Sequence, residues 1–317
     1  MNLRKSIAIA GISALALLGT ACGKDGTPSS DNNNGGASGG GAPGGSNTAS
    51  AKPQLPTYTV KEGVDLSASK TWKTAKDRGH LVVGVKDDQP FLGYQDPATK
   101  ERSGFDVEIA RMVSAELGLD PKKIEFKTIA SVNRETAIQR GDVDYYVGTY
   151  SITDKRKEQI GFAGPYYISG QSLLVQKNNT SINSKDDLKG KKVCSAKGST
   201  PIQKIKNEFP ETTPVEYDTY SLCLDNLLSG QVDAVTTDEA ILKGYAAKDP
   251  DKLKVVGANF SEEKYGIGLP KDDAALRAAV NDALDAKGAD GTWLAIYDAT
   301  LGLSGSPAPA VPAVERY

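Results

Sequence analysis

The 317-residue sequence has few of the side chains that carry metal or nucleophilic chemistry. It contains three cysteines, two methionines and a single histidine, His80. One histidine cannot supply a cluster with metal-ligand spacing, and we find no Cys/His or Ser/His pairing. The phosphate-binding pattern G-x-x-x-x-G-K-[ST] is also missing, so ATP hydrolysis is not expected. These absences predict no metal site and no bound cofactor.

The chain also lacks a large excess of charge of either sign. It has 38 Lys and Arg against 40 Asp and Glu, which gives a formal net charge of −2. Without Arg4 and Lys5 the net charge falls to −4. A mildly acidic chain does not offer the basic surface that nucleic-acid binding requires, so we expect no nucleic-acid partner.

A short apolar run stands near the start. "SIAIAGISALALLGTAC" follows Arg4 and Lys5 and carries no charge up to Cys22. Roughly 15 apolar residues are few for a membrane span, and the charge order is that of a secretory signal. The end of the run, from Leu18 to Cys22, resembles the lipobox of bacterial lipoproteins, whose cysteine is diacylated and becomes the mature N-terminus. Gly19 departs from the leucine usual there, and an ordinary secretory signal cleaved nearby is the alternative.

We therefore expect residues 1–21 to be a signal peptide and residues 22–71 to be a linker. The lipid expected on Cys22, the first residue of this linker, would anchor the protein to the extracellular face of a bacterial cell membrane. After Cys22 the chain is rich in Gly, Ser and Asn, so burial of apolar surface cannot offset its ordering entropy. A spacer of this kind with ~40 residues reaches about 35 Å. Residues 303–317, "LSGSPAPAVPAVERY", are expected to form a flexible tail.

The other two cysteines are Cys194 and Cys223. Outside the cytoplasm an even pair of cysteines predicts a disulfide, and two buried thiols are the alternative. Closing a loop of about 30 residues would stabilise the fold by ~3.5 kcal/mol in the chain-entropy model.

Strand and helix patterns alternate between the linker and the tail. The first round runs from the helix "TWKTAKDRG" and the strand "HLVVGVK" to the strand "VDYYVGTY". A second round begins near Gln171 and continues to the strand "EKYGIGLPK" and the last helices. Strands separated by helices indicate parallel sheets, so these roughly 235 residues predict two α/β lobes in tandem.

Polar residues gather where these strands end. The clusters are Ser131–Arg134, Ser151–Arg156, Gly198–Pro201 and Thr236–Asp238. In open α/β sheets, ligands bind beyond the carboxyl ends of the strands, so the four clusters predict a single site.

Three segments carry a family resemblance. In order, "GFDVEIARMVSAELG", "GDVDYYVGTYSITDKRKEQIGFAGPYY" and "GQVDAVTTDEAIL" resemble the bacterial extracellular solute-binding proteins, family 3, which are the amino-acid receptors of ABC importers. The resemblance covers about residues 75–302. The segment "SVNRETAIQRGDVD" is most similar to the glutamate- and aspartate-binding lipoproteins of Gram-positive bacteria.

This resemblance implies a two-lobed, periplasmic-binding-protein-like α/β fold of type II with two hinge strands crossing between the lobes. By position, these strands are expected around Gln171–Gln176 and Lys264–Leu269. The first lobe would comprise residues 72–170 and 264–302, and the second residues 171–263. The lobes would close on a free amino acid, and the other implied partners are an ABC permease and its ATPase.

The resemblance also assigns site residues. Arg156 matches the arginine that binds the ligand α-carboxylate, which a planar guanidinium can bind through both oxygens. Asp238 matches the carboxylate that binds the α-ammonium, and Arg134 the arginine that holds a distal carboxylate. The other positions implied to line the site are Lys86, Phe91, Ser131, Thr149, Ser151, Gly198, Ser199 and Thr200.

The residues alone leave simpler roles open. Arg134 and Arg156 could lie on solvated helix faces, and Asp238 could be the N-cap of the helix that follows it. If Arg134 is buried, a neutral amide ligand would leave its charge unpaired, so acidic ligands are favoured. The resemblance places glutamate first, then aspartate, glutamine and asparagine.

Two other functions with the same fold remain open: a ligand-sensing module and an enzyme similar to the cyclohexadienyl dehydratases. Dehydration needs a positioned general acid, and the carboxylates at the strand ends already have binding roles. Sensing modules usually continue into a membrane span and an intracellular segment. We therefore expect a receptor and not an enzyme.

Overall fold

The computed structural model describes residues 53–317. The predicted signal peptide, the lipidation site Cys22 and the linker up to residue 52 lie outside the described residues. Within residues 53–317, every helix is too short or too polar to cross a membrane.

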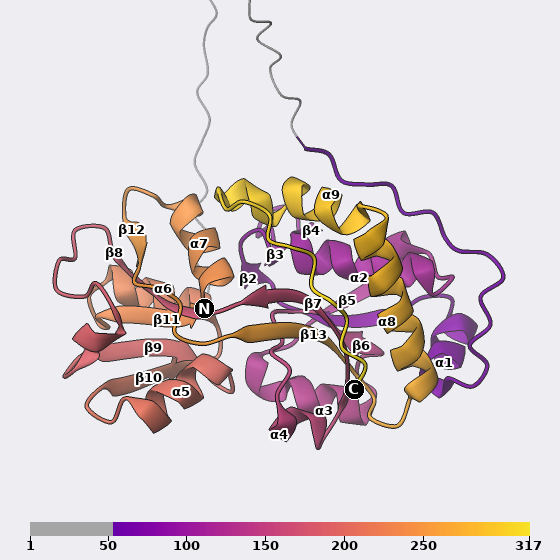
Figure 1. Ribbon diagram of the computed structural model, residues 1–317, viewed down its shortest axis with the longest axis horizontal. Coiled ribbons are helices and arrows are strands. Elements are labelled where there is room, and N and C mark those ends of the chain that lie inside the picture. Colours follow the sequence, from indigo (N-terminus) through magenta and orange to yellow (C-terminus); the bar gives the residue numbers. More distant parts are fainter. Residues whose placement is uncertain (1–52) are drawn as a thin grey trace, which may run out of the picture. The chain divides into compact units, whose positions relative to one another are not determined.

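Two five-stranded sheets, one in each lobe, form the framework (Figure 1). The first has the order β5-β1-β6-β13-β7 and the second the order β10-β9-β11-β8-β12. In both sheets the first three strands are parallel and the last two run antiparallel to their neighbours. The first sheet contains β1 (Val82–Val85), β5 (Glu125–Thr128), β6 (Tyr145–Tyr146), β7 (Gly161–Ser169) and β13 (Glu263–Leu269). The second contains β8 (Gln171–Gln176), β9 (Lys192–Ala196), β10 (Thr213–Tyr217), β11 (Ala234–Asp238) and β12 (Leu253–Val256). The predicted two-lobed α/β fold is confirmed. The expectation of parallel sheets is wrong, because β13 and β8, which the chain enters after crossing between the sheets, run antiparallel to both of their neighbours.

Helices cover both sheets. Those of the first lobe are α1 (Lys70–Arg78), α2 (Phe105–Glu116), α3 (Arg134–Arg140), α4 (Asp154–Lys157), α8 (Ala274–Ala289) and α9 (Thr292–Ala299). Those of the second lobe are α5 (Thr200–Glu208), α6 (Tyr220–Leu228) and α7 (Glu239–Lys248). Short 3-10 turns are η1 (Pro121–Lys123), η2 (Ser131–Asn133), η3 (Lys185–Leu188) and η4 (Leu301–Ser304). In Figure 1, α2 and α9 lie on one side of the first sheet, and α3 and α4 on the other.

A small antiparallel sheet follows β1. It consists of β2 (Asp88–Gln89), β3 (Gly93–Gln95) and β4 (Arg102–Ser103). Gly104 joins it to α2 with a φ of 114°, and a Cβ there would lie 2.3 Å from the carbonyl oxygen of Leu92. Glycine at this position therefore lets α2 start directly against the small sheet.

The chain crosses between the two sheets twice. It passes from β7 through Gly170 into β8, and it returns after β12 to enter the first sheet as β13. Strands β7 and β13 pair from Ser169 and Glu263 to Gly161 and Leu269. The sequence placed the two crossing strands around Gln171–Gln176 and Lys264–Leu269, but β8 lies wholly in the second sheet and β13 wholly in the first. Both segments are apolar, and only strand pairing determines which sheet each one joins.

Residues at the end of the predicted linker pack against the first lobe. The hydroxyl of Tyr58 donates to Glu108 Oε2 at 2.9 Å, and the N–H of Lys61 donates to the carbonyl of Ala115 at 2.9 Å. Val64 and Leu66 contact the core, and α1 begins at Lys70. The Gly/Ser-rich composition behind the linker prediction ends before these apolar side chains, so the described residues 53–69 belong with the first lobe.

The C-terminal residues also contact the first lobe, which their Pro/Ala-rich composition did not anticipate. The N–H of Glu315 donates to the carbonyl of Gly164 at 2.8 Å, and its carboxylate lies 2.6 Å from Lys264 Nζ. Arg316 forms ion pairs with Asp282 and Asp285 in α8, at 2.8 and 2.7 Å. This segment has no helix or strand of its own, and charged side chains at its end fix its course across β7 and β13 (Figure 1).

The predicted disulfide is confirmed. Cys194 in β9 and Cys223 in α6 are bonded, with their Cα atoms 5.6 Å apart, and both side chains are fully buried. The bond joins the strand that leads to Gly198 with the helix that follows β10.

Replacement of both cysteines by serine should lower the free energy of unfolding by about 3.5 kcal/mol, because the unfolded chain regains the entropy of the loop. Urea denaturation of the oxidised protein and of the Cys194→Ser/Cys223→Ser variant would measure this difference. Thiol labelling of the denatured, unreduced protein should modify neither cysteine, and modification of both would contradict the bridge.

Candidate functional site

Arg134 and Arg156 are both buried in the first lobe. Arg134 opens α3 and is 2% exposed, and Arg156 in α4 is 7% exposed. Arg134 Nε donates to the carbonyl of Ser131 at 3.0 Å, and Arg156 Nη1 to the carbonyl of Ser151 at 2.6 Å. Arg156 Nε also lies 3.2 Å from Glu135 Oε1. These contacts exclude a solvated position for either arginine.

Lys86 adds a third buried cation. It follows β1, is 4% exposed, and donates from Nζ to Ser131 Oγ at 2.7 Å. Burial, and then the nearby charge of Arg134, lower the pKa of Lys86 to about 7. Within residues 53–317, the hydrogen bonds of Lys86 and Arg134 go to a hydroxyl and to carbonyls, and not to carboxylates. Asp88 and Asp87 raise the pKa of Lys86 only through space, so neither cation has a carboxylate as a direct partner among the described residues.

The ring of Tyr150 lies against both guanidinium groups. Its centroid is 4.1 Å from Cζ of Arg134 and 4.9 Å from Cζ of Arg156, distances at which the ring quadrupole attracts a cation. Burial, and then the charge of Arg134, lower the pKa of Arg156. Two like charges buried at close range repel each other, so a bound anion would relieve the repulsion.

Gly198 brings the second lobe to these arginines. Its carbonyl oxygen accepts from Arg156 Nη2 at 3.1 Å and from Arg134 Nη2 at 3.5 Å. A Cβ on Gly198 would lie 2.6 Å from Cα of Val132, and its φ is 77°. A side chain at this position would therefore hold the loop before α5 away from the first lobe.

The start of α5 lies next to the hinge. The N-cap residue Ser199 accepts from the N–H of Ile202 at 3.3 Å. Thr200 Oγ1 lies 3.3 Å from Ser151 Oγ and donates to Glu263 Oε2 at 2.8 Å. Hydroxyls from both lobes therefore meet at the first residue of β13.

Asp238 lies at the end of β11 and is 3% exposed. Its Oδ2 accepts from the hydroxyl of Tyr265 in β13 at 2.7 Å, whereas Oδ1 has no partner among the described residues. Asp238 precedes α7 but its side chain makes no cap, so the simpler N-cap role is excluded. Burial, and then the charge of Glu263, raise the pKa of Asp238 to about 8.

Thr149 and Phe91 both have positive φ angles, of 45° and 66°. The carbonyl of Thr149 accepts from Arg134 Nη1 at 3.4 Å, and its hydroxyl donates to Gln89 Oε1 at 3.2 Å. Phe91 lies against α7, where Lys248 Nζ is 5.9 Å from its ring centroid. Thr149 thus belongs with the buried arginines, and Phe91 with the contact between the small sheet and the second lobe.

Three polar residues of this region do not follow from the sequence: Gln89 and Asp106 are fully buried, and the side chain of Glu135 is 19% exposed. Glu135 directly follows Arg134 but pairs with Arg156, 21 positions away. Gln89 has an Nε2 without a partner among the described residues. Asp106 is fully buried beneath Thr149, bonded to Tyr166, and burial raises its pKa to about 7. No sequence signal singled out Asp106, because Glu108 lies in the same first turn of α2 and acidic residues are common at helix starts.

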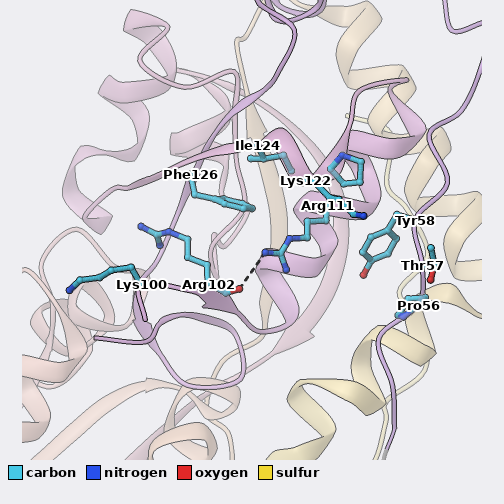
Figure 2. A pocket seen from close by; sticks show the side chains of 10 residues that line it. Pro56, Thr57, Tyr58, Lys100, Arg102, Arg111, Lys122, Ile124 and Phe126 are labelled. Carbon is cyan, nitrogen blue, oxygen red and sulfur yellow. Dashed lines mark hydrogen bonds between the residues drawn. The ribbon is translucent and has the colours of Figure 1, made fainter. Parts of the chain in front are cut away.

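A separate cavity of about 760 Å³ lies elsewhere on the first lobe (Figure 2). Its cations include Arg102 and Arg111, and none of the predicted site residues lines it. Arg102 Nη1 donates to the carbonyl of Lys86 at 3.1 Å, and Arg111 Nη2 to the carbonyl of Arg102 at 3.4 Å. The bond from Arg102 holds the backbone of Lys86 from the side of this cavity, while the side chain of Lys86 extends to Ser131 in the candidate site.

Comparison with known proteins identifies the family. Residues 81–302 match the bacterial extracellular solute-binding proteins, family 3. The chain belongs to this family. It is 41% identical to the glutamate-binding protein GluB of Corynebacterium efficiens over 238 residues, covering 72% of this chain and 81% of that relative. It is 38% identical to the ABC transporter glutamine-binding protein GlnH of Bacillus subtilis over 232 residues, or 73% and 84% of the two chains.

A solved structure agrees with this assignment. An ancestral arginine-binding protein bound to glutamine superimposes with a TM-score of 0.67 at 37% identity, covering 71% of this chain and 99% of that structure. The resemblance found in the sequence is therefore confirmed, and the chain is a solute-binding protein and not an enzyme. Among residues 53–317, no cluster of His, Cys, Asp or Glu is placed to hold a metal ion.

The pair of Glu135 and Arg156 leads to a stability prediction. The Glu135→Gln variant should lose about 1–2 kcal/mol of unfolding free energy without ligand, because Arg156 keeps a buried charge but loses its carboxylate. Urea denaturation would measure this loss. The control is Glu125→Gln, whose carboxylate is half exposed and should matter by less than about 0.5 kcal/mol. Equal effects of the two variants would contradict the assignment of Glu135.

Proposed function

We propose that this protein is the receptor of an ABC importer and binds L-glutamate between its two lobes. The observation that carries the proposal is the pair of buried cations, Lys86 and Arg134, whose partners in residues 53–317 are neutral. An unpaired buried charge is costly, so a ligand that brings a carboxylate to this place gains more than a neutral ligand does.

The distal carboxylate of glutamate would lie near Lys86, Ser131 and Arg134. Ser131 is 2% exposed, accepts from Lys86 Nζ and provides the carbonyl that orients Arg134. A carboxylate accepts hydrogen bonds from an ammonium, a hydroxyl and a guanidinium at the same time. All three groups come from the carboxyl ends of β1 and β5 or from the turn that follows, where the fold positions them without ligand.

The amino-acid end of the ligand would be bound by groups of opposite charge from opposite lobes. Arg156 would hold the α-carboxylate together with Ser151 and the N–H of Thr200, the residue that begins α5, at a helix start that favours an anion. Asp238 would hold the α-ammonium through Oδ1, the oxygen that lacks a partner. The carbonyl of Thr149 is a second acceptor nearby.

Glutamate is placed before its competitors on charge and length. Glutamine and asparagine would leave Arg134 and Lys86 without an anion. Aspartate brings the anion but is one methylene shorter, a difference worth about 1–3 kcal/mol in a fitted pocket. Relatives named for glutamate and for glutamine both resemble this chain, and the buried cations Lys86 and Arg134 support the choice of glutamate.

Delivery to a permease and its ATPase is proposed from the family and from the named relatives of ABC transporters. The proposed location is the extracellular face of the cell membrane. The sequence before residue 53 supports a lipid anchor at Cys22, which would keep the receptor near the permease.

The function is tested by the Arg134→Met variant. Glutamate affinity should fall at least tenfold, because a charge-assisted bond contributes about 1.5–3 kcal/mol, whereas glutamine affinity should change little. Isothermal titration calorimetry with glutamate, aspartate, glutamine and asparagine would measure these changes. Arg140→Met is the matched control, because Arg140 is exposed at the other end of the same helix. Equal losses for glutamate and glutamine, or a wild-type preference for glutamine, would contradict the proposal.

The lowered pKa of Lys86 predicts a pH-dependent preference. The charged fraction of Lys86 in the free protein falls as the pH rises through about 7, so the preference for glutamate over glutamine should shrink. Between pH 6 and pH 8.5 the ratio of the two affinities should change by up to about tenfold. The titration of Asp238, whose pKa is raised to about 8, cancels in this ratio because both ligands carry the same ammonium.

Calorimetry at several pH values would measure the ratio in wild type, Lys86→Met and Lys86→Arg. Both variants should lose the pH dependence, since methionine is never charged and arginine always is. A wild-type slope retained in either variant would assign the titration to another group.

A further inference from the structure

A carboxylate of the first lobe caps a helix of the second. Asp88 Oδ2 accepts hydrogen bonds from the N–H groups of Tyr220 and Ser221, at 2.9 and 3.1 Å. The hydroxyl of Tyr245 in α7 donates to the carbonyl of Asp88 at 2.6 Å and lies 3.4 Å from the same carboxylate oxygen. Strand β2 therefore holds the start of α6 and the middle of α7 together.

The start of α6 needs this partner. The first N–H groups of a helix have no acceptor within the helix. The N-cap residue of α6, Thr219, accepts only from the N–H of Leu222, at 3.3 Å. Asp88 supplies the acceptor for the two preceding N–H groups, those of Tyr220 and Ser221, and its negative charge is favourable at a helix N-terminus. Because the donors and the acceptor belong to different lobes, these bonds exist only while the lobes are together.

Gly244 in α7 allows this helix to approach the first lobe closely. A Cβ on Gly244 would lie 2.5 Å from the carbonyl oxygen of Pro90, which is part of the first lobe. Neither side could move aside easily, because the Cβ would be fixed to helix α7 and the oxygen of Pro90 is a backbone atom. Lys248 on α7 adds a contact, with Nζ 5.3 Å from the ring centroid of Tyr94.

The disulfide joins this contact to the candidate site. Cys223 lies in α6, one turn from the N–H groups that Asp88 accepts, and Cys194 lies in β9. Strand β9 leads to Gly198, whose carbonyl meets Arg134 and Arg156. The two places where the second lobe meets the first are therefore on elements joined by a covalent bond.

We propose that Asp88, Pro90, Tyr220, Ser221, Gly244 and Tyr245 form a closure latch outside the amino-acid site. Asp88 and Gly244 are positioning residues that set how long the lobes remain closed, and neither contacts the ligand. The inference rests on the proposed function in one respect, which is that the lobes close on an amino acid. The latch acts after the ligand has entered, so it controls the dissociation rate and has little effect on association.

Rapid-mixing fluorescence would test the latch on the disulfide-bonded protein. Asp88→Ala should raise the dissociation rate about tenfold, the effect of losing a charge-assisted bond, and leave the association rate within about twofold of wild type. Asp88→Asn keeps an acceptor without the charge and should be intermediate. Glu101→Ala is the control, because this exposed carboxylate directly precedes β4 of the same small sheet and has no side-chain hydrogen bond within residues 53–317, and it should match wild type.

Gly244→Ala separates closure from folding. Alanine is the better helix former, so the thermal midpoint of the ligand-free protein should hold or rise. The added methyl group would meet Pro90, so dissociation should accelerate nonetheless. Dissociation rates of Asp88→Ala and Gly244→Ala within twofold of wild type would overturn the latch, and so would a loss confined to association.

The experiments test the latch and the proposed function separately, so one proposal can be contradicted while the other holds. The ligand for the test is whichever of the twenty amino acids gives the largest thermal shift, so a wrong choice of glutamate does not affect the result. Gly244→Ala should weaken binding of glutamate and glutamine by the same factor, whereas Arg134→Met should change their ratio. Gly244→Ala carries this comparison because it changes no charge, whereas the carboxylate of Asp88 raises the pKa of Lys86. A changed ratio in Gly244→Ala would place the contact in the ligand site and overturn the latch.

Discussion

The guanidinium groups of Arg134 and Arg156 lie against one tyrosine ring with Glu135 as the carboxylate that pairs with one of them. Lys86 adds a third positive charge nearby and is held by a hydroxyl. Burying like charges together is unfavourable, and a fold keeps such a cluster only where other interactions stabilise it. Carbonyls, aromatic rings and one carboxylate hold these cations in place. One carboxylate does not balance three cationic side chains, so the cluster can attract an anion.

The architecture places this charge where a second lobe can reach it. Both arginines follow strands of the first sheet, and the loop before α5 brings the carbonyl of Gly198 from the second sheet. Asp238, the negative end of the site, is bonded to Tyr265 on the hinge strand β13. The site therefore has contacts with both lobes and with the hinge, so a ligand that satisfies the charges also favours closure.

Closure is supported away from the charges as well. The second lobe consists of a five-stranded sheet with three helices, and its disulfide joins the strand next to the site with the helix that Asp88 caps. Rigid coupling of these two elements means that a shift of one moves the other. Under the proposed function, binding of a ligand at Gly198 and Thr200 would therefore also favour the contacts that α6 and α7 make with the first lobe.

The sequence by itself determined those features that depend on local pattern. Alternating apolar periods gave the two α/β lobes, polar clusters after the strands marked Arg134, Arg156 and Asp238, and the parity of the cysteines indicated the bridge. These signals are readable because the period of a helix or strand and the chemistry of its end are properties of neighbouring residues.

Tertiary structure alone decided which partners these residues meet. Asp88 caps a helix 132 positions further along the chain, and Glu263 accepts a hydrogen bond from Thr200, which is 63 positions away in the sequence. The exact crossing between the sheets and the course of the C-terminal segment were likewise not evident from composition. In each case the determining contact joins side chains that are far apart in sequence, and it forms only when both lobes have packed, so no local pattern of residues encodes it.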